Sequence, residues 1–142
     1  MSWLLDTCVI SELAKPRPNR SIVGWIRDRA DHDLFLSAIT IGELEKGIAR
    51  LPDSQRKATL SGWVRHDLTA RFHQRILAID IRVAARWGAL AGASEKKGRP
   101  LPVIDGLIAA TSLQHDLTVV TRNTADLERW GARCFDPWGG SS

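Results

Sequence analysis

Short apolar segments alternate with helix-forming segments along this chain, and that alternation restricts the folds open to it. The apolar segments span residues 3–5, 34–36, 76–79 and 117–121, with a fifth short strand expected at 133–135. Strands buried on both faces read as brief, continuous apolar runs, and helical crossovers between them impose parallel pairing. We therefore expect a three-layer α/β/α sandwich around a short, mainly parallel sheet of four to five strands.

The segments between the strands carry helical periodicity and recognisable capping residues. Helices are expected over approximately residues 7–14, 19–30, 40–51, 53–72, 80 onward, 102–114 and 123–129. Thr40 begins a capping-box pattern that ends at Glu43, and Asp80 is the expected cap of a long helix. The 142 residues suit one domain. We expect residues 1–138 to form it and residues 139–142 to form a flexible tail.

The composition argues against several classes of protein. No apolar run approaches the roughly 20 residues of a membrane span, and the N-terminus lacks a secretory pattern. Two cysteines, Cys8 and Cys134, do not make a disulfide framework, so the cytoplasm is the expected location. The net charge of +4 is compatible with a polyanionic partner such as nucleic acid.

Four carboxylates stand near the ends of predicted strands or the starts of predicted helices. They are Asp6, Glu43, Asp105 and Asp126. In a parallel sheet, the carboxyl ends of the strands share one edge, so these groups can converge there. Clustered carboxylates need protonation or a divalent cation to offset their repulsion, and hard oxygen ligands suit Mg²⁺ or Mn²⁺.

Each of these residues also has a purely local explanation. Glu43 completes the capping box begun by Thr40, Asp105 suits the positive end of a helix dipole, and Asp6 can cap the helix that follows it. Asn123 is likewise a suitable cap for the last predicted helix. Pattern and spacing alone therefore leave structural and metal-binding roles open.

Four stretches, taken together and in order, resemble the PIN-domain family, specifically its VapC-like toxins of bacterial toxin–antitoxin pairs. They are Leu4–Glu12, Leu36–Leu44, Ile104–Thr111 and Val119–Leu127, and the ending Cys134–Trp138 resembles the FitB-like branch of that family. The resemblance spans nearly the whole chain. It implies a PIN-like sandwich with an acidic pocket that binds Mg²⁺, for which Mn²⁺ can substitute, and that cleaves RNA endonucleolytically.

The resemblance also assigns roles residue by residue. Asp6, Glu43 and Asp105 match the main acidic positions of the metal site and of catalysis, and Asp126 or Asn123 matches the fourth. Thr7, Thr121 and Asn123 match positions that support the site. One departure is Cys8, which stands where many relatives carry Asn, and it is expected to alter the support around Asp6 or simply to pack in the core.

The same resemblance implies partners. An antitoxin protein is expected to block the acidic pocket, and the toxin is expected to form a homodimer. RNA contacts are expected from basic residues near the pocket in sequence, namely Lys96, Lys97, Arg99 and Arg122. The four histidines are expected at the surface.

Two alternatives remain beside the nuclease. A PIN-like binding module that has lost its chemistry is one. The other is a phosphohydrolase or receiver domain, but the second aspartate that a haloacid-dehalogenase-type site needs is replaced by Cys8.

Overall fold

A computed structural model of the protein describes residues 1–139, and within them five strands form one sheet with parallel pairing throughout. The strands are β1 (Trp3–Leu5), β2 (Leu34–Ser37), β3 (Ile76–Leu77), β4 (Thr118–Val120) and β5 (Cys134–Phe135). Their order across the sheet is β3-β2-β1-β4-β5, so β1 lies at its centre, between β2 and β4. The predicted α/β/α architecture is confirmed. Residues 140–142 of the predicted tail lie outside the described residues.

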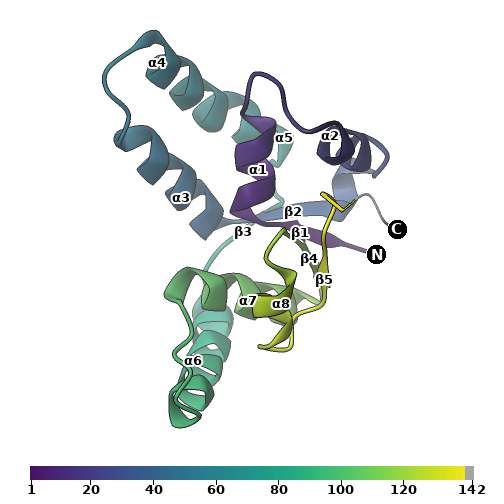
Figure 1. Cartoon of the computed structure of the whole chain (residues 1–142), viewed down its shortest axis with the longest axis vertical. Helices are drawn as coiled ribbons and strands as arrows, with labels where there is room; N and C mark the ends of the chain where they lie inside the picture. The colour runs from purple at the N-terminus through teal and green to yellow at the C-terminus, as the bar shows by residue number, and fades with distance from the viewer. Residues whose placement is uncertain (140–142) are drawn as a thin grey trace.

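Helices cover both faces of this sheet (Figure 1). On one side lie α1 (Thr7–Leu13), α2 (Arg20–Arg27), α3 (Ala38–Ala49), α4 (Gln55–Gly62), a π-helical turn (Trp63–Leu68) and α5 (Thr69–Arg71). On the other side lie α6 (Ile81–Lys96), α7 (Val103–His115) and α8 (Thr124–Glu128). A 3₁₀ turn (Asp31–Asp33) leads into β2. Within residues 1–139, none of the helices combines the length and apolar character needed to cross a membrane.

The core follows from the alternation of side chains along the central strands. Leu5 and Val120 pack on the side of α1 and α2, whereas Leu4 and Val119 pack against Ile108 of α7. All five side chains are buried. Because successive strand residues point to opposite faces, a run of three apolar residues supplies both layers at once.

One predicted helix start, at Asp80, is confirmed, and another, at Thr40, is wrong. Asp80 caps α6 as expected, since its side chain accepts a hydrogen bond from the Val83 N–H at 3.0 Å. The capping box at Thr40 is wrong: α3 begins two residues earlier, and Ser37 caps it by accepting from the Ile39 N–H at 3.1 Å. Thr40 is instead fully buried within the first turns of α3.

The contact between α6 and α7 depends on Gly106, because a glycine has no side chain to occupy the space between the two helices. A Cβ atom added at Gly106 of α7 would lie 2.8 Å from Leu101 Cδ2 and 2.9 Å from Trp87 Cδ1.

We expect Gly106→Ala to lower the free energy of unfolding by about 1–3 kcal/mol through overpacking, measured by urea denaturation. Gly88→Ala on α6 is the matched control. Its Cβ meets nothing within 4 Å, so we expect stabilisation of up to about 1 kcal/mol. Equal stabilisation by both variants would contradict this packing.

Candidate active site

Asp6 is the best-anchored of the predicted site residues. It follows β1 directly, and its backbone N–H donates to the Val120 carbonyl at 3.0 Å, which continues the pairing of β1 with β4. Its Oδ1 accepts from the Thr7 N–H at 2.8 Å and so caps α1. Its Oδ2 accepts from the buried Thr121 hydroxyl at 2.7 Å. Both carboxylate oxygens are therefore held at the carboxyl edge of the sheet.

Glu43 is brought to the same edge by a second hydroxyl. The Thr7 hydroxyl donates to Glu43 Oε1 at 2.5 Å, and it also lies 3.1 Å from the hydroxyl of Thr40. Thr7 is thus in contact with Asp6 through its backbone and with Glu43 through its side chain. A single residue of α1 links the carboxylate after β1 to the carboxylate on α3.

Asp105 and Asp126 complete the acidic cluster from the other layer of helices. Asp105 lies in the first turn of α7 and Asp126 in the first turn of α8, and both line one cavity of about 230 Å³. Burial raises the pKa of Asp105 above its usual range, and the charges of Asp6, Asp126 and Glu43 raise it further. The four predicted carboxylates therefore lie within electrostatic range of one another.

The donor atoms of this cluster fit a hard divalent cation in their chemistry, because they are carboxylate and hydroxyl oxygens at a place where negative charge accumulates. Within residues 1–139, no three side chains of His, Cys, Asp or Glu lie close enough together to coordinate one ion. Binding of a shared ion therefore requires these side chains to draw closer than they lie here.

The remaining predicted site residues take separate positions. The Asn123 backbone N–H donates to the Thr121 hydroxyl at 3.0 Å, while its side chain makes no capping hydrogen bond to α8. The Cys8 thiol lies 3.7 Å from Asp6 Oδ2 and 3.7 Å from the Thr121 hydroxyl. Burial, followed by the charge of Asp6, raises the pKa of Cys8, so the thiol is kept neutral beside the carboxylate. The histidines, His32, His66, His73 and His115, are exposed as expected.

The four basic residues predicted near the pocket do not gather in one place. Lys97 and Arg99 line a cavity beside the acidic cluster, whereas Lys96 is the exposed last residue of α6. Arg122 stacks over the Trp138 ring, with its guanidinium carbon 4.1 Å from the ring centroid. That contact joins the residues after β4 and β5, and sequence spacing gave no signal for it.

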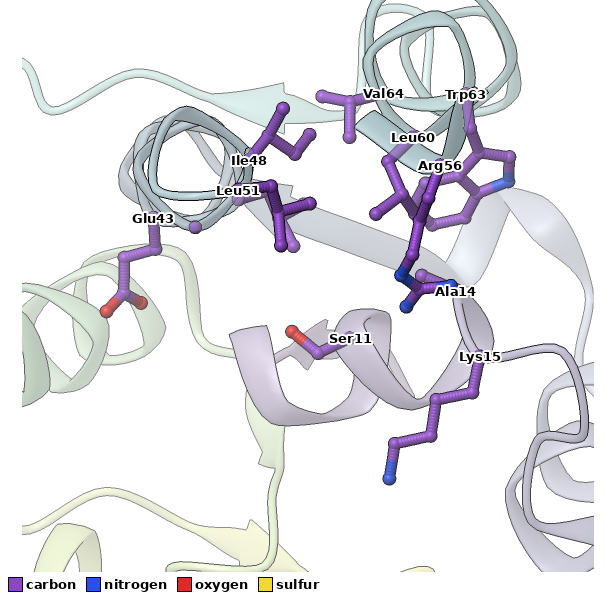
Figure 2. Close-up of a pocket in the computed structure, with 12 residues that line it drawn as sticks. Ser11, Ala14, Lys15, Glu43, Ile48, Leu51, Arg56, Leu60, Trp63 and Val64 are labelled. Carbon is purple, nitrogen blue, oxygen red and sulfur yellow. The ribbon is translucent and has the colours of Figure 1, made fainter. Parts of the chain in front are cut away.

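A groove of about 250 Å³ begins beside Glu43 and runs between α1, α3 and the helix pair that follows (Figure 2). Its apolar lining is Leu44, Ile48, Leu51, Leu60, Trp63 and Val64. Figure 2 shows Glu43 at one end of this groove and the cationic groups of Lys15 and Arg56 toward the other. Leu44 and Ile48, two apolar side chains of α3, therefore line this groove, and Leu44 also packs against the core.

Comparison with known proteins gives this arrangement a family. A PIN domain family model matches residues 3–131. Toxin FitB of Neisseria gonorrhoeae is 38% identical over 135 residues, which cover 95% of this chain and 97% of that protein. VapC ribonuclease Y4jK of Sinorhizobium fredii is 33% identical over 135 residues, with 95% and 96% covered.

Solved structures agree with the sequence match. The crystal structure of FitAcB from Neisseria gonorrhoeae superposes with a TM-score of 0.88 at 38% identity and covers 96% of this chain and 98% of that one. An all-parallel sheet with acidic side chains at its carboxyl edge is the arrangement that the resemblance to PIN domains implies. The chain belongs to the PIN-domain family.

The burial of Asp105 and its repulsion by the neighbouring carboxylates have a measurable consequence for stability. Asp105 binds a proton more readily in the folded chain than in the unfolded chain, so the stability linked to its protonation is lost as pH rises through the folded pKa. With divalent cations removed by EDTA, we expect Asp105→Asn to raise the free energy of unfolding near neutral pH by up to about 1 kcal/mol. The gain should vanish below the ordinary carboxyl pKa of about 4.

Denaturation curves recorded across this pH range test the expectation. Asp67→Asn is the control, because Asp67 is exposed on the π-helical turn and away from the acidic cluster. A gain from Asp105→Asn that is independent of pH, or one matched by Asp67→Asn, would contradict the proposed repulsion.

Proposed function

We propose that this chain is a divalent-metal-dependent endoribonuclease that acts as the toxin of a toxin–antitoxin pair. The observation that carries the proposal is the convergence of four carboxylates toward the carboxyl edge of the sheet, where burial and the charges of the other three raise the pKa of Asp105. Such a cluster is costly to a fold and is typical of a cation-binding site. The names of its relatives, Toxin FitB and VapC ribonuclease Y4jK, supply the substrate and the role.

In this proposal, Asp6, Glu43, Asp105 and Asp126 hold Mg²⁺, for which Mn²⁺ substitutes. When bound, the cation supplies Lewis acidity, which makes water a better nucleophile and stabilises negative charge at the phosphate. Hydrolysis by water does not need the ribose 2′-OH as nucleophile. We therefore expect products with a 5′-phosphate.

The hydroxyl groups of the chain fix the acidic side chains for this chemistry. Thr121 donates to Asp6 and accepts from the Asn123 N–H, so the residues after β4 hold the carboxylate after β1. The Thr7 hydroxyl likewise donates to the Glu43 carboxylate and holds it in place. Asp6 and Glu43 are therefore already oriented, as ligands are by supporting residues in other metal sites, and a shared ion still requires the four carboxylates to draw closer together.

The structure favours Asp126 over Asn123 as the fourth acidic position. Asp126 shares a cavity with Asp105 and raises the pKa of that residue. The backbone of Asn123 serves the Thr121 hydroxyl, and its neutral amide adds no charge to offset that of a cation. We assign the fourth position to Asp126 on these grounds.

Cleavage of cellular RNA is the direct test. We expect purified, antitoxin-free protein with Mg²⁺ or Mn²⁺ to cut total RNA, and Asp105→Asn to lower the rate about 100-fold or more. EDTA should abolish cutting, and Asp67→Asn should cut as the parent does. A folded parent that cuts nothing in the presence of metal would instead support the alternative of a PIN-like binding module.

We further propose that the apolar groove beside Glu43 receives the antitoxin. The groove can bury an apolar helix face or extended segment of a partner. Its two ends differ in charge, with Glu43 at one and Lys15 and Arg56 toward the other. A partner with a cationic side chain near Glu43 and acidic side chains near Lys15 and Arg56 would be complementary to it. A partner seated there would lie next to the acidic cluster and could block it. The expected homodimer remains a prediction.

Filling the groove tests this assignment. Gly47 lines the groove, and a Cβ added there meets nothing within 4 Å. We expect Gly47→Leu to weaken binding of a candidate antitoxin, encoded beside this chain, by about tenfold or more, measured by calorimetry. Gly42→Leu is the matched control on the same helix, because Gly42 also has open space but lies outside the groove. Equal affinities for both variants would place the antitoxin elsewhere.

A further inference from the structure

Two cavities lie side by side next to the acidic cluster, and neither is explained by the metal ligands alone. One has a volume of about 210 Å³ and the other about 230 Å³. Both are lined by Arg99, Arg129 and Trp130, so they adjoin each other, and we name them together the basic groove. The groove ends at Asp105 and Asp126 on one side and continues along α6 on the other.

The α6 end of the basic groove is a hydrogen-bonded turn that carries two cationic residues. Gly98 has a φ of +71°, which favours glycine, and its N–H donates to the Glu95 carbonyl at 3.0 Å. The Arg99 N–H donates to the Ser94 carbonyl at 2.9 Å, and together these bonds make a Schellman motif. Lys97 and Arg99 flank the glycine, so the turn that ends α6 also fixes where both side chains start.

The opposite wall of the basic groove comes from the end of α8. Arg129 lies 4.0 Å from the Asp126 carboxylate, and both side chains are about half exposed, at 50% and 54%. Trp130 packs partly on the core beneath α7 and leaves part of its ring in the groove. Trp130 therefore shares the lining of the basic groove with two arginines, Arg99 and Arg129, and with the acidic residues Asp105 and Asp126.

We infer that the basic groove binds the single-stranded RNA that flanks the cleaved bond, with phosphate oxygens on Lys97 and Arg99 and a base stacked on Trp130. The inference rests on the proposed function. A nuclease built on carboxylates repels its own substrate, and cations next to the cluster offset that repulsion for the neighbouring phosphates. Cations beside a partly exposed aromatic ring, as Trp130 provides here, are a combination by which proteins hold single strands without reading their sequence.

Binding measured without cleavage tests the cationic part. In an Asp105→Asn background, we expect the pair Lys97→Gln and Arg99→Gln to weaken binding of a fluorescein-labelled single-stranded RNA of about 12 nucleotides by tenfold or more. The slope of log affinity against log salt should fall by about 0.7 for each phosphate that the variant no longer neutralises. Arg82→Gln on α6 removes an exposed charge outside the groove and should change neither quantity by more than about twofold.

The aromatic part is tested by a graded substitution. Trp130→Leu should weaken binding by about tenfold, whereas Trp130→Phe keeps a ring and should retain most of the affinity. With Asp105 intact, the Lys97 and Arg99 variants should raise KM and leave kcat near that of the parent. Arg129 is left in place, because removing it would also release Asp126.

The outcomes separate this inference from the proposed function. If the parent cuts RNA with metal but the groove variants bind and cut as the parent does, with an unchanged salt slope, the basic groove is not an RNA site. A duplex DNA of equal length that binds as tightly, and is weakened as much by the substitutions, would also overturn the assignment to single-stranded RNA. Failure of the parent to cut RNA at all would instead count against the proposed function.

Discussion

The hydrogen bond between Thr121 and Asp6 joins the ends of β4 and β1 at the edge where the site forms. At 2.7 Å it fixes one oxygen of the carboxylate, and the cap on α1 fixes the other. The backbone of Asp6 meanwhile extends the pairing of β1 with Val120. One side chain thus ends a strand, starts a helix and defines the acidic edge. The positions of Glu43, through Thr7, and of the helices that follow are set relative to it.

The same arrangement lowers the stability of the fold without a cation and favours the binding of one. Burial and the neighbouring carboxylates raise the pKa of Asp105, and both destabilise the fold when Asp105 is ionised, because its charge loses water and lies closer to like charges than in the unfolded chain. A cation that binds only the folded chain reverses this effect by mass action. The neutral thiol of Cys8 fits this balance, since it contacts Asp6 without adding another charge.

Features that depend on local sequence pattern, such as the strands, were predicted correctly. Features that depend on contacts between residues distant in sequence, such as the start of α3, were not. Brief apolar runs located all five strands, because a doubly buried strand needs no more than that. Thr40 and Ser37 are both acceptable caps for α3, and only the contact of Thr40 with Thr7, which comes from another helix, shows why Thr40 lies inside instead. Trp130 was not predicted as a site residue, since nothing in its local sequence reports the turn after α6 that faces it.

The acidic cluster has an apolar groove on one side and the basic groove on the other. The two grooves suit different proposed partners, the antitoxin and RNA. On the α3 side, Glu43 opens onto an apolar groove, whose surface favours burial of protein side chains. On the α7 and α8 side, Asp105 and Asp126 open onto the basic groove, whose cations favour phosphates. An inhibitor seated on the apolar side needs only to reach the carboxylates to stop cleavage and need not compete for the phosphate contacts. If the two proposed assignments hold, recognition of the antitoxin and recognition of RNA can vary independently, because the two grooves share only the acidic cluster that lies between them.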